Sequence, residues 1–134
     1  LEINCETDFV AKTEGFQELS KDIAMHIAAA SPVSVSKEDI PLDVIEKERE
    51  IYMEQAKNSG KPDEIAKKMV DGRMDKFCKE NALLDQQFVK DPNMTVKEVL
   101  TDTIAKLGEN ISIARFVRFQ LGENSSSSSS KDSE

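Results

Sequence analysis

The sequence contains few of the residues from which metal centres, disulfide frameworks and membrane spans are built. Its 134 residues include one histidine, two cysteines, one tyrosine and no tryptophan. A single histidine, His26, excludes a two-histidine metal motif, and two cysteines without a recognisable spacing are too few for a disulfide framework or a zinc site. We expect Cys5 and Cys78 to be reduced thiols packed as small apolar side chains, and we expect no metal and no cofactor. The apolar runs are far shorter than a membrane span, so no membrane partner is expected.

Charge is biased toward acid. The 26 acidic residues outnumber the 18 basic ones, which gives a net charge of −8. Binding to nucleic acid needs clustered lysine and arginine, so we predict no direct nucleic-acid partner and expect the partner to be a protein. An apolar content of 38% in a chain of this length allows one hydrophobic core but hardly two.

The first thirty residues combine a strand pattern with a helical one. Alternating apolar and polar residues over positions 1–5 predict a half-buried strand. Apolar residues at helical spacing between Phe9 and Ile27 predict one amphipathic helix that continues to about Ala30. The junction between the two patterns is therefore a turn at a sheet edge.

That junction is the tetrapeptide Thr7, Asp8, Phe9 and Val10. Thr7 or Asp8 can cap the helix by accepting a backbone N–H bond, and Asp8 also complements the positive end of the helix dipole. On residue chemistry alone a core position for Phe9 is favoured, because apolar residues beside a cap usually staple the helix to its own domain. The alternative is that Phe9 protrudes to meet a partner.

The middle of the chain predicts an extended link or short strand over residues 31–36 and then two helices. Pro41 and Gly60 bracket the first helix, and Pro62 begins the second. The two helices are predicted to form a hairpin across residues 58–61.

The last third predicts one more helix and a strand. Thr95 and Glu98 form a capping box, and Gly108 closes the helix as a left-handed cap. Alternating apolar residues over 111–121 then predict a strand. Arg115 or Arg118 on this strand is either a contact for an acidic partner or an ordinary solvated or salt-bridged charge, and the pattern leaves both alternatives open.

Together these patterns predict an α+β domain over residues 1–123, with a small antiparallel sheet covered by helices and a helical hairpin. Residues 124–134 are mostly serine and charged residues. They are predicted to be disordered because they cannot bury enough apolar surface. Because the sequence begins inside a strand pattern, we expect an excised or processed module.

Catalytic chemistry finds no support in the sequence. Gly60-Lys61 is followed by Pro62 and lacks the upstream glycine of a phosphate-binding loop. No Ser–His–Asp or Cys–His arrangement is supported either. We therefore predict no catalytic residues and expect that the protein is not an enzyme.

Several separate motifs carry a resemblance to a known family. Residues 1–19, LEINCETDFVAKTEGFQEL, resemble the start of the core domain of bacterial and organellar elongation factor Ts. The resemblance continues through residues 21–29, 59–62, 69–74 and 116–119, and covers about 1–123. The sequence at residues 82–86 and 107–110 is most similar to that of cyanobacterial and plastid members.

This resemblance implies nucleotide exchange on the GTPase elongation factor Tu, in the cytoplasm or the plastid stroma. The family's Thr-Asp-Phe-Val turn disturbs the magnesium and nucleotide site of that GTPase, which assigns the role to Thr7, Asp8, Phe9 and Val10, with Phe9 as the wedge. Met25 and His26 are implied as an additional partner contact. For His26 the alternative is a histidine half-buried in its own fold.

The resemblance covers one repeat of the family core, where longer members carry two. A homodimer that rebuilds a two-lobed surface is therefore expected. The alternative function is that of a non-enzymatic interaction or scaffold domain, in a ribosome-associated or multi-module protein, without strong exchange activity.

Overall fold

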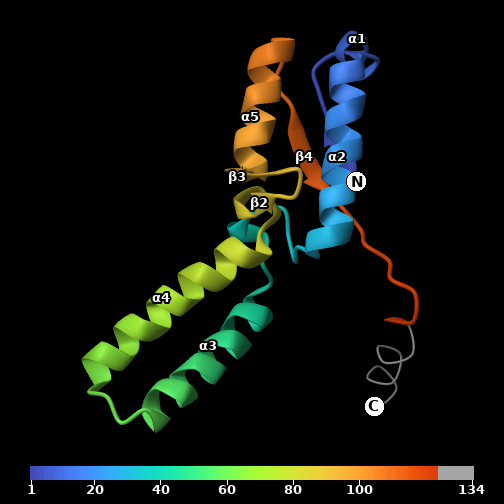
Figure 1. Cartoon of the computed structure of the whole chain (residues 1–134). Helices are drawn as coiled ribbons and strands as arrows, with labels where there is room; N and C mark the ends of the chain where they lie inside the picture. Colours follow the sequence, from blue (N-terminus) through green and yellow to red (C-terminus); the bar gives the residue numbers. More distant parts are fainter. Residues whose placement is uncertain (124–134) are drawn as a thin grey trace.

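The computed structural model describes residues 1–123, which form an α+β core and a long helical hairpin that extends from it (Figure 1). The fold class agrees with the prediction, whereas the predicted tail at 124–134 lies outside the described residues. The elements in chain order are β1 (Glu2–Asn4), α1 (Asp8–Ala11), α2 (Glu14–Ala30), α3 (Leu42–Asn58), α4 (Asp63–Asn81), β2 (Gln87–Phe88), β3 (Asp91–Thr95), α5 (Val96–Leu107) and β4 (Ser112–Arg115). Short 3-10 helices occupy Lys37–Asp39 and Leu83–Asp85.

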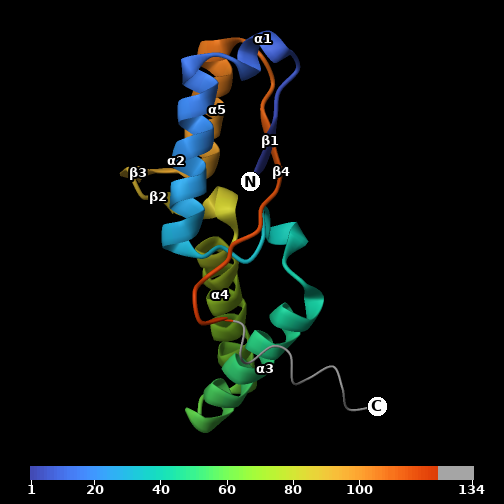
Figure 2. The same cartoon turned by 90° about the vertical axis from the view of Figure 1, so that its right-hand side faces the viewer.

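The core is built around α2 and α5, which lie side by side, while β1 and β4 run along one side of the pair (Figures 1 and 2). β1 and β4 are antiparallel, with Ile3 opposite Ile113 and a register shift between Glu2 and Ile3. The helices and strands bury one continuous apolar cluster because each turns its apolar face inward. The buried members are Val10, Phe16, Leu19, Ile23, Ile27, Leu83, Phe88, Val96, Leu100, Ile111 and Ile113.

The predicted first helix is interrupted, so the prediction of one continuous helix from Phe9 to Ala30 is wrong. α1 ends after one turn, and Thr13 caps a new helix by accepting from the Phe16 N–H at 3.3 Å. The Thr13 hydroxyl also donates to the Val10 carbonyl at 2.7 Å. A threonine that bonds to the backbone on both sides competes with the helical ladder and explains the break.

α5 begins and ends as its sequence predicts. The Thr95 hydroxyl accepts from the Glu98 N–H at 3.2 Å. Gly108 adopts the left-handed conformation, with φ of 74°, and its N–H donates to the Ile104 carbonyl. Both ends are decided by neighbouring residues, which is why the local pattern was sufficient.

The helical hairpin is also confirmed. α3 and α4 pack along each other and bury a second, smaller apolar cluster of Ala56, Ala66, Val70 and Met74. The hairpin joins the core where the extended link at 33–35 lies beside residues 81–84. The Leu83 N–H donates to the Ser34 carbonyl at 2.8 Å, and the Leu84 N–H donates to the Val35 carbonyl at 3.0 Å.

The predicted strand at 111–121 is too long. β4 ends at Arg115, and the apolar side chains of Val117, Phe119 and Leu121 beyond it are exposed. Alternation alone does not make a strand, since each strand needs a hydrogen-bonding neighbour, and β1 pairs only as far as Arg115.

The sheet also differs from the prediction of one small sheet. The described residues contain two separate two-stranded sheets, β1–β4 and β2–β3. The β2–β3 hairpin was not predicted, because a two-residue strand is too short to show alternation and because β3 contains Pro92, which is depleted in strands.

Candidate partner-binding site

The tetrapeptide at residues 7–10 forms the turn between β1 and α2, at the far end of the core from the hairpin (Figure 1). Thr7 is the N-cap of α1, and its hydroxyl accepts from the Val10 N–H at 3.4 Å. Its carbonyl accepts from the Ala11 N–H at 3.3 Å and from the Cys5 thiol at 3.1 Å. The N-cap role predicted for Thr7 or Asp8 therefore falls to Thr7.

Phe9 and Val10 differ sharply in burial, although they are adjacent in this turn. The Phe9 side chain is 80% exposed, whereas Val10 is 9% exposed and belongs to the core cluster. A core position for Phe9, which its chemistry alone favoured, is wrong, and Val10 anchors the turn instead. Leaving a phenylalanine side chain in water forgoes about 2 kcal/mol of the stabilisation that its burial would give. The exposure therefore favours a role outside the chain's own fold.

Asp8 is exposed beside Phe9. Its carboxylate lies 3.6 Å from the Lys12 ammonium, one turn along, with both side chains more than 70% exposed. A pair in such contact with water contributes little to stability and exchanges readily for another partner. Asp8 is therefore available to a charged or polar group that approaches the turn.

Glu109 holds the start of this turn and was not singled out from the sequence. Its carboxylate accepts from the Thr7 N–H at 3.0 Å and from the Thr7 hydroxyl at 2.5 Å, although the residues are 102 positions apart. The only local signal was the position of Glu109 directly after the predicted helix-ending Gly108. Nothing in the local pattern around Thr7 indicates that contact.

His26 lies in the interior, which corrects its prediction as a direct partner contact. The ring is fully buried, and Nδ1 accepts from the Val89 N–H at 3.2 Å. Nε2 therefore carries the proton and donates to Oε1 of Gln86 at 3.0 Å. Phe88 stacks on the ring, so His26 presents no atom to a partner in this structure. Its neighbour Met25 is half exposed and can be contacted.

Gln86 extends this buried contact to the hairpin. Its side-chain amide donates to the Glu80 carbonyl at 2.8 Å and to the Ala30 carbonyl at 3.5 Å. His26 and Gln86 thus connect the end of α2, the end of α4 and the β2–β3 hairpin. Buried polar groups with all their bonds satisfied fix one arrangement of the elements around them.

The two arginines after the core helices make contacts within the chain. Arg115 pairs with Glu2 across the strands, with Nε and Oε1 3.3 Å apart. Arg118 donates to the Ala28 carbonyl at 3.3 Å. Of the two alternatives predicted for these arginines, Arg115 shows the salt-bridged one.

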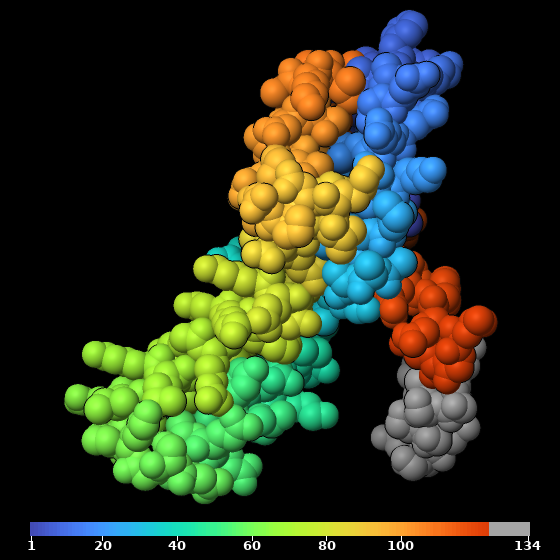
Figure 3. All heavy atoms as spheres, in the orientation of Figure 1, coloured from blue at the N-terminus to red at the C-terminus, as the bar shows by residue number. Residues whose placement is uncertain are grey.

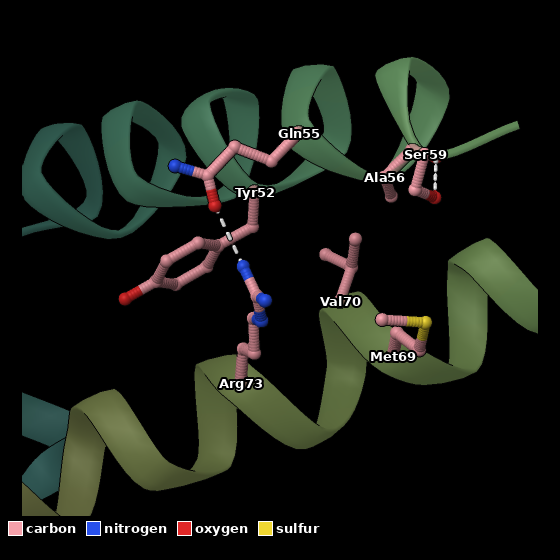
Figure 4. A pocket seen from close by; sticks show the side chains of 7 residues that line it. All are labelled: Tyr52, Gln55, Ala56, Ser59, Met69, Val70 and Arg73. Carbon is pink, nitrogen blue, oxygen red and sulfur yellow. Dashed lines mark hydrogen bonds between the residues drawn. The ribbon is translucent and has the colours of Figure 1, made fainter.

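A small cavity of about 50 Å³ lies between α3 and α4 (Figure 4). Arg73 reaches across it, donates to Gln55 at 2.6 Å, and lies 5.6 Å from the Tyr52 ring centroid. Burial, and then the neighbouring Glu48 carboxylate, raise the pKa of Tyr52 above its usual 10.0. The cavity is far smaller than known ligand sites, which makes it a packing feature of the hairpin.

Residues 1–123 contain no group of three or more histidine, cysteine, aspartate or glutamate side chains placed to hold a metal ion. Within the same span, no helix has the length and apolar character needed to cross a membrane. Cys5 and Cys78 are half-buried thiols that are not joined in a disulfide. The turn that carries Asp8 and Phe9 remains as an exposed feature that the core holds in place through Val10.

Comparison with known proteins identifies relatives of the chain. It is 62% identical over 123 residues to the elongation factor Ts of Carboxydothermus hydrogenoformans, which covers 92% of this chain and 57% of that protein. It is 55% identical over 123 residues to the elongation factor Ts of Fervidobacterium nodosum, covering 92% of this chain and 62% of that protein. The elongation factor Ts of Thermoanaerobacter sp. strain X514 is 55% identical over 131 residues, or 98% of this chain and 64% of that protein.

These relatives are longer than the chain, which spans between 57% and 64% of their length. The alignment of 131 residues leaves at most three of the 134 outside it, so it includes the turn at 7–10. A family model described as Elongation factor TS matches residues 17–123. On this match, and on the identity over nearly its whole length, the chain belongs to the elongation factor Ts family.

Proposed function

We propose that this protein binds elongation factor Tu and promotes GDP release, as a translation elongation factor that acts by nucleotide exchange and not as an enzyme. Membership of the elongation factor Ts family supports the class of function. The observation that carries the proposal is Phe9, which is 80% exposed on a turn whose next residue, Val10, is buried in the core. An apolar side chain on a fixed support can enter a crevice of a partner without a large ordering cost.

In the proposed mechanism Phe9 is the wedge and Asp8 is its polar neighbour. Phe9 enters an apolar crevice beside the nucleotide site of the GTPase, and Asp8 disturbs the groups that place the magnesium ion. Magnesium is the dominant counter-charge of the bound diphosphate, so weakening its site weakens GDP binding. Exchange then follows because the factor and the nucleotide favour different conformations of the GTPase.

The remaining predicted residues have supporting roles in this proposal. Thr7 and Val10 hold the turn, through its cap and its core anchor. Met25 is the additional contact because its side chain is half exposed. His26 acts indirectly by supporting the segment that carries Met25.

Release of labelled GDP from elongation factor Tu tests the wedge. We expect Phe9→Ala to weaken stimulated release strongly, because it removes the apolar contact and leaves the core intact. Phe119→Ala is the matched control, since Phe119 is 89% exposed and follows β4, which ends at Arg115, outside the turn at 7–10. Equal effects of the two variants, or a large loss of thermal stability in Phe9→Ala, would contradict the proposed role.

A magnesium titration at constant ionic strength tests the mechanism. Magnesium and the exchange factor are proposed to favour different states of the GTPase, so each must weaken the other. Stimulation should therefore fall as magnesium rises, while constant ionic strength keeps general charge screening fixed. If magnesium leaves the stimulation unchanged, or if an Asp8→Ala/Phe9→Ala double variant stimulates as well as the wild type, a scaffold role is the better explanation.

The proposal also includes a cellular compartment and an oligomeric state. The protein is proposed to act in the cytoplasm or the plastid stroma, and immunolabelling of source cells distinguishes the two compartments. It is further proposed to pair as a homodimer, since the resemblance covers one repeat of a core that some family members repeat. Sedimentation equilibrium across a concentration series measures that association directly.

A further inference from the structure

The cap of α1 lacks a residue that the cap of α5 has. Both helices begin with a threonine, Thr7 and Thr95, whose hydroxyl accepts from a backbone N–H three residues on. A capping box adds an acid or glutamine at that third position, which accepts from the N–H of the capping residue. α5 has Glu98 at this position, whereas α1 has Val10, which is turned into the core.

Glu109 takes the place of the missing acid from a distant part of the sequence. Its Oε1 accepts from the Thr7 N–H at 3.0 Å and its Oε2 accepts from the Thr7 hydroxyl at 2.5 Å. The left-handed turn at Gly108, with φ of 74°, carries the chain from the end of α5 to this position. One carboxylate thereby fixes the start of α1 relative to the end of α5.

These bonds use every polar group of Thr7. The hydroxyl donates to Glu109 and accepts from Val10, the N–H donates to Glu109, and the carbonyl accepts from Ala11 and from the Cys5 thiol. A hydroxyl with its donor and an acceptor site both occupied has one preferred rotamer. Bonds to an ionised carboxylate are also among the stronger hydrogen bonds in proteins.

The single turn of α1 needs such support. It has four residues, and one helical turn is unfavourable alone because it fixes several dihedral angles for very few bonds. Phe9 adds little to its stability because its side chain faces outward. The order of the turn therefore depends on the burial of Val10, on the bond from the Thr13 hydroxyl to the Val10 carbonyl, and on the contact between Thr7 and Glu109.

We propose that Glu109 is a positioning residue, whose carboxylate holds the turn at residues 7–10 in the conformation that presents Asp8 and Phe9 to the partner. That this conformation serves partner binding rests on the proposed function, whereas the contact between Glu109 and Thr7 does not. Without Glu109 the turn spends part of its time in other conformations, and apparent affinity falls with the fraction that is competent to bind. We expect a loss of about tenfold for Glu109→Ala and a smaller loss for Glu109→Gln, which keeps one acceptor oxygen.

Amide hydrogen exchange of the protein without any partner tests the holding contact. Glu109→Ala and Thr7→Val should each speed exchange at the N–H groups of residues 10–12 and leave the middle of α2 and α5 unchanged. Asp102→Asn is the control because it removes a negative charge from the exposed face of α5. Unchanged exchange at residues 10–12 in Glu109→Ala would overturn the proposal, and so would equal acceleration throughout the core, which indicates general destabilisation.

Stimulated GDP release tests what the contact does for function. Glu109→Ala should raise the concentration needed for half-maximal stimulation about tenfold while the maximal rate changes little, because the wedge itself is intact. In an Asp8→Ala/Phe9→Ala background, which lacks both side chains that the turn presents, the same change should have no further effect, whereas a general loss of stability would act in both backgrounds. An additional loss in that background would overturn the positioning role. If the wild type does not stimulate release at all, the proposed function fails, and hydrogen exchange alone still decides whether Glu109 holds the turn.

Discussion

The core and the α3–α4 hairpin are made from similar amphipathic helices but are stabilised differently. In the core, α2 packs one face against its neighbours, chiefly α5 and α1, and it contributes to a cluster of eleven buried apolar residues. In the hairpin, α3 and α4 pack mainly against each other, and their cluster contains four buried apolar residues. The space-filling view shows the hairpin reaching away from the core as a separate arm (Figure 3).

This difference indicates where the molecule is rigid. Because buried apolar area is the main favourable term in folding, the hairpin should open locally at a lower free energy than the core. The proposed binding turn is attached to the well-packed end of the molecule, through Val10 and Glu109. A side chain held by a well-packed core can enter a partner without first becoming ordered, whereas the hairpin is the part expected to change conformation more readily.

The largest expected effect comes from the centre of the core. Ile23 is fully buried between helices and strands. Ile23→Ala should lower the free energy of unfolding by about 4 kcal/mol, because it loses burial and leaves a cavity in a region that cannot collapse. Urea denaturation followed by circular dichroism measures the loss. A change below about 1 kcal/mol would show that the core is as loosely packed as the hairpin.

The junction of the two regions should give the next largest effect. His26→Phe keeps a ring that can stack on Phe88 but leaves the buried Gln86 carbonyl oxygen and the partly buried Val89 N–H without their partner. Orphaned buried polar groups cost about 1–3 kcal/mol each, so we expect a loss of about 3 kcal/mol. Met25→Ala, at the exposed neighbouring position, is the control and should change stability by less than about 1 kcal/mol. Similar losses in the two variants would mean that the buried bonds contribute nothing.

A smaller and more local effect is expected in the hairpin. Val70 is buried in the four-residue cluster, and Val70→Ala removes two methyl groups, a loss of about 2 kcal/mol. Hydrogen exchange should accelerate along α3 and α4 while α2 and α5 keep their protection. If the core helices accelerate equally, the two regions unfold as one unit and the distinction between them fails.

Features decided by neighbouring residues were predictable from the sequence. The cap and end of α5 and the hairpin between α3 and α4 follow from Thr95, Gly108, Gly60 and Pro62, whose effects reach only a turn or two. Features decided by tertiary contacts were not predictable. The strand pattern after Arg115 lacks a neighbouring strand, and residues at helical spacing did not reveal that Thr13 begins a new helix.

The candidate site shows the same division. The protrusion of Phe9 was expected from resemblance and not from its chemistry, since a local pattern cannot tell which of two adjacent apolar residues faces the core. The burial of His26 depends on Gln86 and Val89, which are about sixty residues away. Glu109 meets Thr7 only because the end of α5 returns to the start of α1. Such contacts need the fold before they can be seen.

The smallest expected effect is the titration of Tyr52 in the hairpin. Burial and then Glu48 raise its pKa above 10.0, so the fold favours the neutral phenol. Stability from this preference is complete below the unfolded-state pKa, near 10, and is lost as pH rises through the higher folded-state pKa. Tyr52 is the sole tyrosine and tryptophan is absent, so phenolate absorbance reports this residue alone. The midpoint should be higher in the native protein than in urea, and Glu48→Gln should reduce the difference by removing one of its causes. Equal midpoints in both solvents would show that the hairpin leaves the Tyr52 ring in water, and would make the contrast with the enclosed core still larger.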